Sequence, residues 1–374
     1  MKIGNYHCPA CKRAYAADRP LWRCECGSHL NLGPGGEFGR GAIVAGEASL
    51  WRYAEALALS GPPRVSLGEG WTPLLQIDWD GARIHFKLES QMPTGSFKDR
   101  GTVVMLNHLL EIGVGAIHED SSGNAGASIA TYAAAAGIAC RIYVPASAPR
   151  AKLVQIAAAG ADVRPIPGTR QDVTEAALAA VGESFYASHN WHPFFLQGTK
   201  TLAYELWEDL GFRAPDNIIT PCGAGSNVLG CEIGFSELLR VGEIDAMPRI
   251  FAAQPANCGP IAAAFLGEGA PEIKPTIAEG TAIAQPIRMI EVLGTLRETR
   301  GGAVMLSEEE IAAATLDLAR IGIYVEPTSA QAAAAFRKLR AAGAITPEQT
   351  TVLVLTGSGL KATPRIAELL SVEL

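Results

Sequence analysis

The chain lacks a long apolar run, an excess of basic residues and a large charged fraction. Only 18% of its 374 residues are charged, and the formal net charge is −7. A bilayer span needs about 18 or more apolar residues, and general affinity for nucleic acid needs positive charge, so we expect neither partner. The 48% of hydrophobic residues excludes a disordered chain. The first residues contain no apolar signal core, which predicts a cytoplasmic protein.

Cysteine is infrequent, and four of the eight cysteines form two close pairs. Cys8 is near Cys11, and Cys24 is near Cys26. Two such pairs predict a zinc ribbon in which four thiolates hold a structural metal ion. Two disulfides are the alternative, which a cytosolic location disfavours. Free buried thiols are the ordinary interpretation of the remaining cysteines.

The run GSFKDRG at residues 95–101 is the strongest chemical signal in the chain. It places Lys98 between an expected strand at residues 84–88 and an expected helix at residues 102–111. A helix start attracts anions, and a nearby positive field makes an amine easier to deprotonate. Lys98 is therefore suited to form an imine with a carbonyl cofactor. A surface lysine at a helix start is the alternative interpretation.

Three segments rich in small residues could complete a site around that lysine. Residues 121–128 precede an expected helix, and their small side chains suit a carboxylate. Residues 221–230 follow an expected strand, and their glycines suit a phosphate. Residues 355–361 follow another strand and offer a hydroxyl, which suits a neutral pyridine nitrogen. Taken singly, these segments are also typical of a capped helix start, a common strand-to-helix turn and an ordinary strand end.

Together with residues 65–74 and 322–330, these segments resemble the fold-type II enzymes that use pyridoxal 5′-phosphate (PLP), and most closely the threonine synthases. The matches extend from Trp51 to Lys361 in the family's order. The resemblance implies PLP as cofactor, a small amino acid as substrate and a homodimer. It also implies a lyase that converts O-phosphohomoserine to threonine and phosphate. Several members of the family carry a ribbon like the one predicted here.

The resemblance also assigns roles to individual residues. Lys98 would form the Schiff base and act as the base for the substrate Cα proton, with Phe97 beside the cofactor ring. Asn124 would bond the 3-oxygen, and Thr356 would meet the pyridine nitrogen. The cofactor phosphate would be bound by Gly223, Ala224, Gly225, Ser226 and Asn227. The substrate carboxylate would be bound by Ser121, Ser122 and Gly123. Glu326 lies in a matched segment without an assigned role.

Apolar strand runs alternate with alanine-rich helices along most of the chain. This alternation predicts an α/β fold with parallel sheets. The resemblance implies two doubly wound domains, as in the β subunit of tryptophan synthase, with the cofactor between them. We expect the following organisation: a zinc ribbon at 1–31, a linker at 32–45, a large PLP domain at 46–104 and 191–374, and a small mobile domain at 105–190.

Two positions depart from the family pattern. Phe195 stands where the family has an arginine that would bind the substrate phosphate, and a phenyl ring cannot replace that bidentate cation. Ala125-Gly126 stands where many threonine synthases have Thr-Ser, and this pair looks more like the threonine and serine dehydratases. The charge missing at Phe195 could come from Arg150, Lys152 or Lys200. The aromatic patch of Trp191, Phe194 and Phe195 is either core or an apolar wall of the site.

These departures keep two other functions open. An ammonia-lyase or a β-replacement synthase that acts on a β-substituted amino acid would fit an altered substrate site. A zinc-ribbon binding protein on a degenerate, non-catalytic PLP fold is the alternative from a different class. The intact set of Lys98, Asn124, glycine-rich loop and Thr356 argues against the latter.

Overall fold

The structure is a computed structural model that describes residues 4–33 and 35–373. Residues 1–3 and 34, which the predicted ribbon and linker include, and residue 374 of the predicted large domain lie outside the described residues. The chain divides into two compact units. Unit 1 comprises the N-terminal part up to Gly70 and residues 98–199, and unit 2 comprises residues 71–97 and the chain from residue 200 onward. These limits are drawn differently from the predicted domain limits, which stay a prediction.

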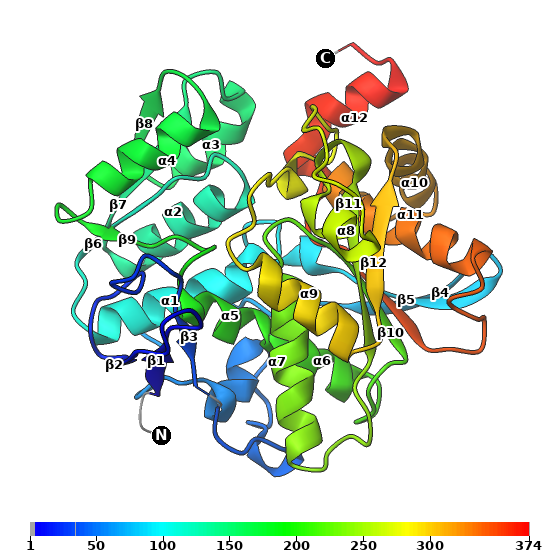
Figure 1. Ribbon diagram of the computed structural model, residues 1–374, viewed down its shortest axis with the longest axis horizontal. Helices are drawn as coiled ribbons and strands as arrows, with labels where there is room; N and C mark the ends of the chain where they lie inside the picture. The colour runs from blue at the N-terminus through cyan, green and yellow to red at the C-terminus, as the bar shows by residue number, and fades with distance from the viewer. Residues whose placement is uncertain (1–3, 34, 374) are drawn as a thin grey trace. The chain divides into compact units, whose positions relative to one another are not determined.

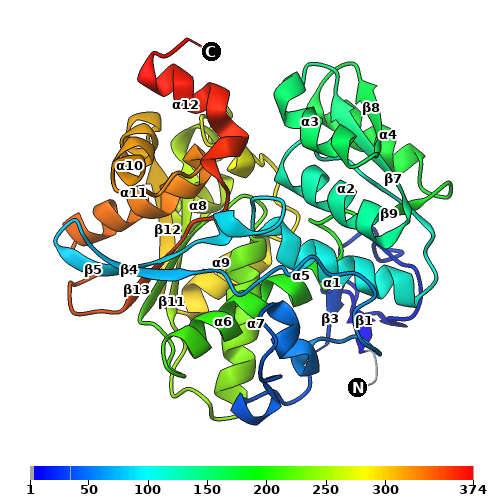
Figure 2. The same ribbon diagram turned by 180° about the vertical axis from the view of Figure 1, so that it is seen from behind.

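Unit 1 contains a small antiparallel sheet and a four-stranded parallel sheet (Figures 1 and 2). The small sheet has the order β2-β1-β3, and its strands are β1 (Asn5–His7), β2 (Ala14–Ala16) and β3 (Asn31–Leu32). The parallel sheet has the order β8-β7-β6-β9, and its strands are β6 (Ala116–Glu119), β7 (Ala139–Pro145), β8 (Asp162–Ile166) and β9 (Phe185–Tyr186). The helices are η1 (Arg40–Ala42), η2 (Leu50–Ala56), α1 (Lys98–Glu111), α2 (Asn124–Ala136), α3 (Arg150–Ala158), α4 (Arg170–Ala179) and α5 (Pro193–Thr199).

Local sequence explains where the helices of unit 1 begin and end. Helix α2 is built almost entirely of small residues and ends at Gly137, which adopts a left-handed conformation with φ of 68°. Helix α4 begins with a capping box, in which Thr169 and Asp172 satisfy each other's backbone N–H groups. A continuous core joins α1 and α2 to the small sheet, because Tyr6 and Leu30 of the ribbon segment are buried in it.

Unit 2 is organised around a six-stranded sheet with the order β12-β11-β10-β13-β5-β4 (Figures 1 and 2). All neighbours are parallel except β4, which pairs with β5 in the antiparallel direction. The strands are β4 (Leu74–Trp79), β5 (Ala82–Lys87), β10 (Asn217–Pro221), β11 (Arg249–Pro255), β12 (Gly302–Leu306) and β13 (Thr351–Val354). The helices are η3 (Glu89–Gln91), α6 (Thr201–Asp209), α7 (Ser226–Arg240), η4 (Ala256–Cys258), α8 (Pro260–Leu266), η5 (Glu279–Thr281), α9 (Met289–Glu298), α10 (Glu308–Arg320), α11 (Pro327–Ala341), η6 (Gly359–Ala362) and α12 (Thr363–Leu370).

The central strands of unit 2 are buried on both sides. Every residue of β10 and β13 is buried, as expected for parallel strands covered by helices. Helix α11 lies against β10 to β13, and α7 and α9 lie against β11. The run of four alanines from Ala332 to Ala335 is buried in α11, so small side chains let this helix approach the sheet closely.

The α/β class and the parallel sheets agree with the prediction from sequence, and several element limits shift. Helices α1 and α2 begin earlier than expected, because Lys98 and Asn124 are themselves the first helical residues. Residues 50–56 form a 3₁₀ helix, η2, with a kink at Tyr53. None of the helices within the described residues has the length and apolarity that a membrane crossing requires.

Candidate active site

Lys98 opens helix α1 in unit 1, and the first turn of that helix is held from the side by α2. The Oγ atom of Ser128 lies 2.6 Å from a carboxylate oxygen of Asp99 and 2.9 Å from Oγ1 of Thr102. All three residues are buried, whereas Lys98 itself is partly exposed. The backbone that carries the predicted Schiff-base lysine is therefore fixed, while its side chain remains accessible.

Helix α5 packs closely against α1 beside the lysine. A Cβ atom on Gly101 would come within 2.6 Å of the Phe195 ring, and one on Gly198 would lie 1.9 Å from the carbonyl oxygen of Arg100. Phe194 and Phe195 are fully buried, so the core interpretation of the aromatic patch holds for both. The Phe195 ring nevertheless has Lys98 Nζ 5.5 Å from its centre, so it also borders the space next to the amine.

The loop that carries Asn124 leaves β6 and turns directly into α2. Gly123 is the N-cap of α2 and Asn124 is its first residue, so the alternative of a serine or asparagine N-cap is not what this helix uses. A Cβ atom on Gly126 would lie 1.9 Å from the carbonyl oxygen of Ser121. This close approach explains the departure at Ala125-Gly126, because a serine at position 126 would collide with the loop in its present conformation.

Buried ionisable side chains gather at the carboxyl edge of the four-stranded sheet. Glu119 ends β6, and Asp120 follows it and accepts hydrogen bonds from Tyr186 at 2.9 Å and Thr174 at 2.8 Å. Arg170 forms an ion pair with Asp120 at 2.9 Å. Burial raises the pKa of both Glu119 and Asp120 above the usual carboxyl range. The strands' carboxyl edge is where α/β folds bind ligands, and it leads here into the Asn124 loop.

His189 belongs to the same edge and was not singled out from the sequence. Its backbone N–H donates to Glu119 Oε2 at 3.0 Å, and its ring Nδ1 lies 3.4 Å from the same oxygen. The ring is almost fully buried and packs edge-on against Phe195, with ring centres 5.6 Å apart. Phe195 thus touches both Lys98 and His189. A histidine three residues beyond a short strand carried no motif signal that could have identified it.

In unit 2, two of the predicted motifs lie side by side. Phe97 donates its backbone N–H to the carbonyl oxygen of Thr356 at 2.9 Å, and Ser96 forms an antiparallel bridge with Gly357. Thr356 is buried, and its hydroxyl lies 3.0 Å from that of Ser329. Ser329 was part of a matched segment without a role, and its contact orients the hydroxyl predicted to meet the pyridine nitrogen.

Glu326 lies beside the same turn. Its backbone N–H donates to the carbonyl oxygen of Gly357 at 3.1 Å. A Cβ atom on Gly357 would come within 2.4 Å of the Glu326 carboxylate, so only glycine leaves room for that side chain. Glu326 therefore packs against Gly357, the residue that follows Thr356, so it lies next to one of the predicted site residues of unit 2.

The glycine-rich loop of unit 2 connects β10 to α7. Gly225 is the N-cap of α7 with φ of 94°, and a Cβ atom there would come within 2.2 Å of Val292. Asn227 donates to Thr220 at 3.5 Å, while its Oδ1 atom is buried without a hydrogen-bond partner among the described residues. The loop thus presents the backbone N–H groups of a helix N-terminus next to glycines, which fits a bound phosphate. Burial raises the pKa of the Cys222 thiol to about 12, so that thiol is not a nucleophile.

The four N-terminal cysteines converge in space. The Sγ atoms of Cys8 and Cys26 are 3.5 Å apart, as are those of Cys11 and Cys24. All four Sγ atoms lie within 4.8 Å of one another. A tetrahedral Zn²⁺ with Zn–S bonds of about 2.3 Å needs sulfur atoms about 3.8 Å apart, so the cluster has the right size for this ion.

The cysteine-bearing segment is anchored to the helix that begins with Lys98. The Tyr6 hydroxyl lies 3.0 Å from Nε2 of His108, which is buried in α1. His108 stacks on Phe194 with ring centres 3.6 Å apart, and Tyr6 meets Phe194 edge-on. Desolvation lowers the pKa of His108 to about 3, so this ring is neutral. Through α1 and α5, the ribbon segment is continuous with the packing around Lys98.

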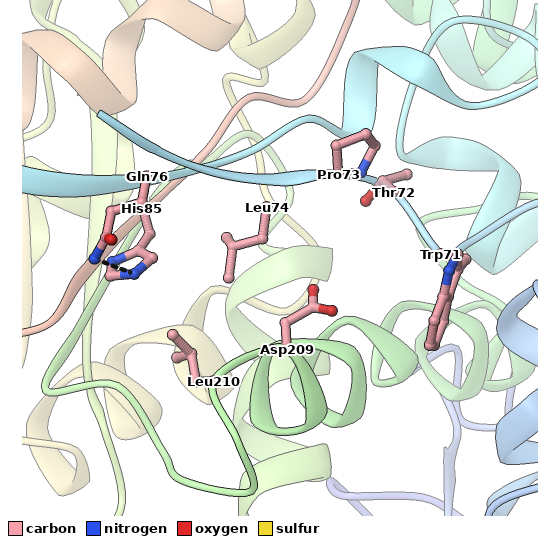
Figure 3. Close-up of a pocket in the computed structure, with 8 residues that line it drawn as sticks. All are labelled: Trp71, Thr72, Pro73, Leu74, Gln76, His85, Asp209 and Leu210. Atoms are coloured by element: carbon pink, nitrogen blue, oxygen red, sulfur yellow. Dashed lines mark hydrogen bonds between the residues drawn. The ribbon is translucent and has the colours of Figure 1, made fainter.

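Unit 2 also contains a separate pocket of about 520 Å³ (Figure 3). Lys87 lies beneath it, fully buried, and pairs with Glu205 and Asp209, each at 2.7 Å. Figure 3 shows the Asp209 carboxylate between Leu74 and the exposed Trp71. The lining residues are Trp71, Thr72, Pro73, Leu74, Gln76, His85, Asp209 and Leu210. None of the predicted site residues is among them.

Comparison with known proteins agrees with this geometry. Residues 65–357 match the family described as pyridoxal-phosphate dependent enzyme. The fold and the matched region therefore define a PLP-dependent enzyme. Threonine synthase from Methanosarcina acetivorans is 37% identical over 84% of this chain and 80% of its own length. Threonine synthase from Methanocaldococcus jannaschii is 33% identical over 95% of this chain and 92% of its own length. The chain belongs to the threonine synthase family and is a PLP-dependent lyase.

Solved structures support the fold. The processed form of threonine deaminase isoform 2 from Solanum lycopersicum has a TM-score of 0.68 at 20% identity, and covers 80% of this chain and 83% of its own. Maize serine racemase has a TM-score of 0.64 at 22% identity, and covers 77% of this chain and 88% of its own. At these identities the likeness concerns the fold, and it confirms the fold-type II assignment.

Proposed function

We propose that this lyase is a threonine synthase that converts O-phosphohomoserine to threonine and inorganic phosphate. The observation that carries the proposal is the backbone pairing of Phe97 with Thr356 within unit 2, because it joins two family motifs, one of which continues in sequence to Lys98. The 33–37% identity to threonine synthases over most of the chain supports the same activity. O-Phosphohomoserine is an amino acid, in agreement with the small substrate expected from sequence.

Each predicted site residue has a proposed role in that reaction. When bound, PLP supplies the electron sink that acidifies the substrate Cα–H bond. Lys98 would hold the cofactor, accept the Cα proton and return it, and Phe97 would support the cofactor ring. Asn124 would bond the 3-oxygen, and Thr356, oriented by Ser329, would offer its hydroxyl to a neutral pyridine nitrogen. The loop formed by Gly223, Ala224, Gly225, Ser226 and Asn227 would hold the cofactor phosphate. The segment formed by Ser121, Ser122 and Gly123 would bind the substrate carboxylate.

Of the three candidate residues that could supply the positive charge missing at Phe195, Lys200 is unsuitable. Lys200 is fully buried and paired with Glu237 at 3.0 Å, and burial lowers its pKa, so it is committed to the core of unit 2. Arg150 and Lys152 begin α3 in unit 1, and Arg150 is exposed. We assign the substrate phosphate to the positively charged start of α3.

The decisive experiment measures phosphate release from O-phospho-L-homoserine by the PLP-loaded protein. We expect threonine to form in equal amount, and Lys98→Ala to lose at least about a thousandfold in rate. Lys274→Ala is the matched control, because Lys274 is exposed and forms a surface ion pair with Glu272. Absence of phosphate release by a protein that visibly binds PLP would rule out threonine synthase.

A second candidate function rests on Phe195. Its buried ring stands next to Lys98 in place of a cation, which suits a substrate without a phosphate. An ammonia-lyase or β-replacement enzyme for β-substituted amino acids would have such a site. A panel of these amino acids, assayed for 2-oxo acids and for replaced products, tests this candidate, and an unreactive panel removes it.

We also propose that the N-terminal segment is a zinc ribbon held by Cys8, Cys11, Cys24 and Cys26. The convergence of four Sγ atoms supports it, and the closed set of thiolates suits a structural ion. Metal analysis of the purified protein should give one zinc per chain, and Cys8→Ser should lower that ratio. Two disulfides, detected as an absence of free thiols in this segment, would contradict it. The homodimer, the cytoplasmic location and the limits of the mobile small domain stay predictions.

A further inference from the structure

Two of the four N-terminal cysteines are buried and two are exposed. Cys8 and Cys24 are almost fully buried, whereas Cys11 and Cys26 are exposed. A Zn²⁺ ion with four thiolate ligands carries a net charge of about −2, and a buried negative charge needs hydrogen-bond donors to offset the loss of water. Water can supply donors to the two exposed sulfur atoms. The two buried sulfur atoms have to receive them from the protein.

The first cysteine pair supplies such a donor from its own backbone. The N–H group of Cys11 donates to Cys8 Sγ at 3.4 Å. The same turn closes through two backbone hydrogen bonds. Lys12 N–H donates to the carbonyl oxygen of Cys8 at 3.0 Å, and Cys8 N–H donates to that of Arg13 at 2.9 Å. The buried sulfur of this pair therefore has a local donor.

The second pair is one residue shorter, and both backbone bonds of its turn span one residue less. Gly27 N–H donates to the carbonyl oxygen of Cys24 at 2.9 Å, and Cys24 N–H donates to that of Ser28 at 2.9 Å. The counterpart of the Cys11 donor would be the N–H group of Cys26. That group faces Cys24 Sγ, but the hydrogen bonds that this sulfur makes within the described residues are to the Cys11 thiol and to a tyrosine hydroxyl. The shorter turn therefore does not reproduce the backbone bond of the first pair.

Tyr15 lies where the second buried sulfur needs a donor. Its hydroxyl oxygen lies 3.2 Å from Cys24 Sγ and accepts the backbone N–H of Glu25 at 3.3 Å. A zinc-bound thiolate has no proton to donate, so the hydroxyl hydrogen of Tyr15 is the one that lies between the oxygen and the sulfur. The hydroxyl group thus connects an N–H group of the shorter turn to the buried sulfur of the same turn.

We propose that Tyr15 supplies the hydrogen bond that the shortened cysteine turn lacks, and thereby helps the N-terminal segment to retain zinc. The inference rests on the proposed zinc ribbon and adds to it a residue that binds no metal itself. Tyr15 is buried in strand β2, which pairs with β1, so the sheet fixes the position of its ring. A hydrogen bond to a metal-bound sulfur stabilises its negative charge, so the metal is lost less easily to competing ligands.

Tyr6 offers a matched control, because it stands directly opposite Tyr15 on the neighbouring strand β1. Its hydroxyl lies 3.0 Å from Nε2 of His108. Both tyrosines are buried in one core. Tyr6→Phe and Tyr15→Phe therefore each remove one buried hydroxyl from the same small sheet, and only Tyr15→Phe removes a donor to sulfur. General loosening of the segment would affect both variants.

Zinc release from the full-length, zinc-loaded protein to the coloured chelator pyridylazoresorcinol measures the effect. We expect release to be about tenfold faster in Tyr15→Phe and to change by less than about twofold in Tyr6→Phe. A spectroscopic readout uses protein reconstituted with Co²⁺ in place of zinc. Loss of the hydrogen bond raises the energy of the sulfur lone pair, so the sulfur-to-cobalt charge-transfer band should move to longer wavelength in Tyr15→Phe alone. The band position is independent of the amount of protein that binds metal, so it reports the bond even in a less stable variant.

The outcomes are distinct. Equal release rates for the wild type and Tyr15→Phe, or an equal acceleration in both variants, would overturn the role of Tyr15. A charge-transfer band that stays in place in Tyr15→Phe would do the same. A wild-type protein that purifies without zinc and takes up neither zinc nor Co²⁺ would instead refute the proposed ribbon, whatever the variants show.

Discussion

The two parallel sheets end in edges of opposite chemical character. The carboxyl edge of the four-stranded sheet carries buried ionisable groups, Glu119, Asp120 and His189. The carboxyl edge of the six-stranded sheet carries the glycine-rich loop and the hydroxyl pair of Thr356 and Ser329. The first edge is rich in titratable side chains, whereas the second offers backbone N–H groups and hydroxyls. Two parallel sheets of the same kind thus end in groups of different chemistry.

The largest expected effect comes from crowding the helix that starts with Lys98. Gly198→Ala would place a methyl group 1.9 Å from the carbonyl oxygen of Arg100, so α5 must move away from α1. We expect the free energy of unfolding to fall by about 3 kcal/mol, measured by urea denaturation. Gly294→Ala in α9 of unit 2 is the control, because its new methyl group meets nothing within 4 Å. It should gain about 0.5 kcal/mol. Equal stabilities would contradict the tight packing inferred for unit 1.

The next largest expected effect is a loss of stability at acid pH that begins in unit 1. His108 is neutral in the folded state, with its pKa lowered to about 3, whereas an unfolded histidine takes up a proton below about pH 6.5. Stability therefore falls as the pH falls from 6.5 towards 3, by about 2 kcal/mol between pH 7 and pH 5. Comparison of the wild type with His108→Gln at both pH values isolates this contribution. Hydrogen exchange should show α1 weakening before β10, and the reverse order would place the acid-sensitive core in unit 2.

A smaller effect tests the anchoring edge. Gly225→Ala forces a left-handed backbone on alanine and brings its Cβ within 2.2 Å of Val292, so the start of α7 must shift. We expect the dissociation constant of PLP to rise about tenfold, measured by titration of the cofactor-free protein. Gly242→Ala, at the other end of α7, has φ of 77° and open space. It should reduce stability by about 1 kcal/mol and leave PLP affinity unchanged.

The smallest effect concerns the ribbon. Tyr6→Phe removes the hydroxyl that bonds His108 and leaves that buried nitrogen unsatisfied. We expect a loss of about 1 kcal/mol in the free energy of unfolding, measured in urea. Tyr324→Phe is the control, because Tyr324 is 40% exposed. A loss no larger than the control's would show that shape alone, rather than the hydrogen bond, attaches the ribbon to α1.

The predictions from sequence succeeded where a local pattern determines the element. The parallel α/β class was predicted correctly, because apolar runs such as those of β10 and β13, in which every residue is buried, mark parallel strands covered by helices. The starts of α1 and α2 were placed too late, because Lys98 and Asn124 look polar and yet lie within helices. The contacts of Ser329 with Thr356 and of Glu119 with His189 arise only from the tertiary structure, since no short motif brings these residues together. The closeness of Phe195 to Lys98 likewise depends on Gly101, which faces the Phe195 ring, and on Gly198, which faces the carbonyl oxygen of Arg100.

The bond between Tyr6 and His108 bears on how this protein could be rebuilt. The cysteine-bearing N-terminal segment could be exchanged for a segment from another protein that brings four cysteines of its own. A substitute without a tyrosine two residues before its first cysteine would leave His108 of α1 and Phe194 of α5 without the ring that covers them. An exchanged segment therefore has to keep two features together. These are the four cysteines proposed to bind the metal ion and the tyrosine that attaches the segment to α1.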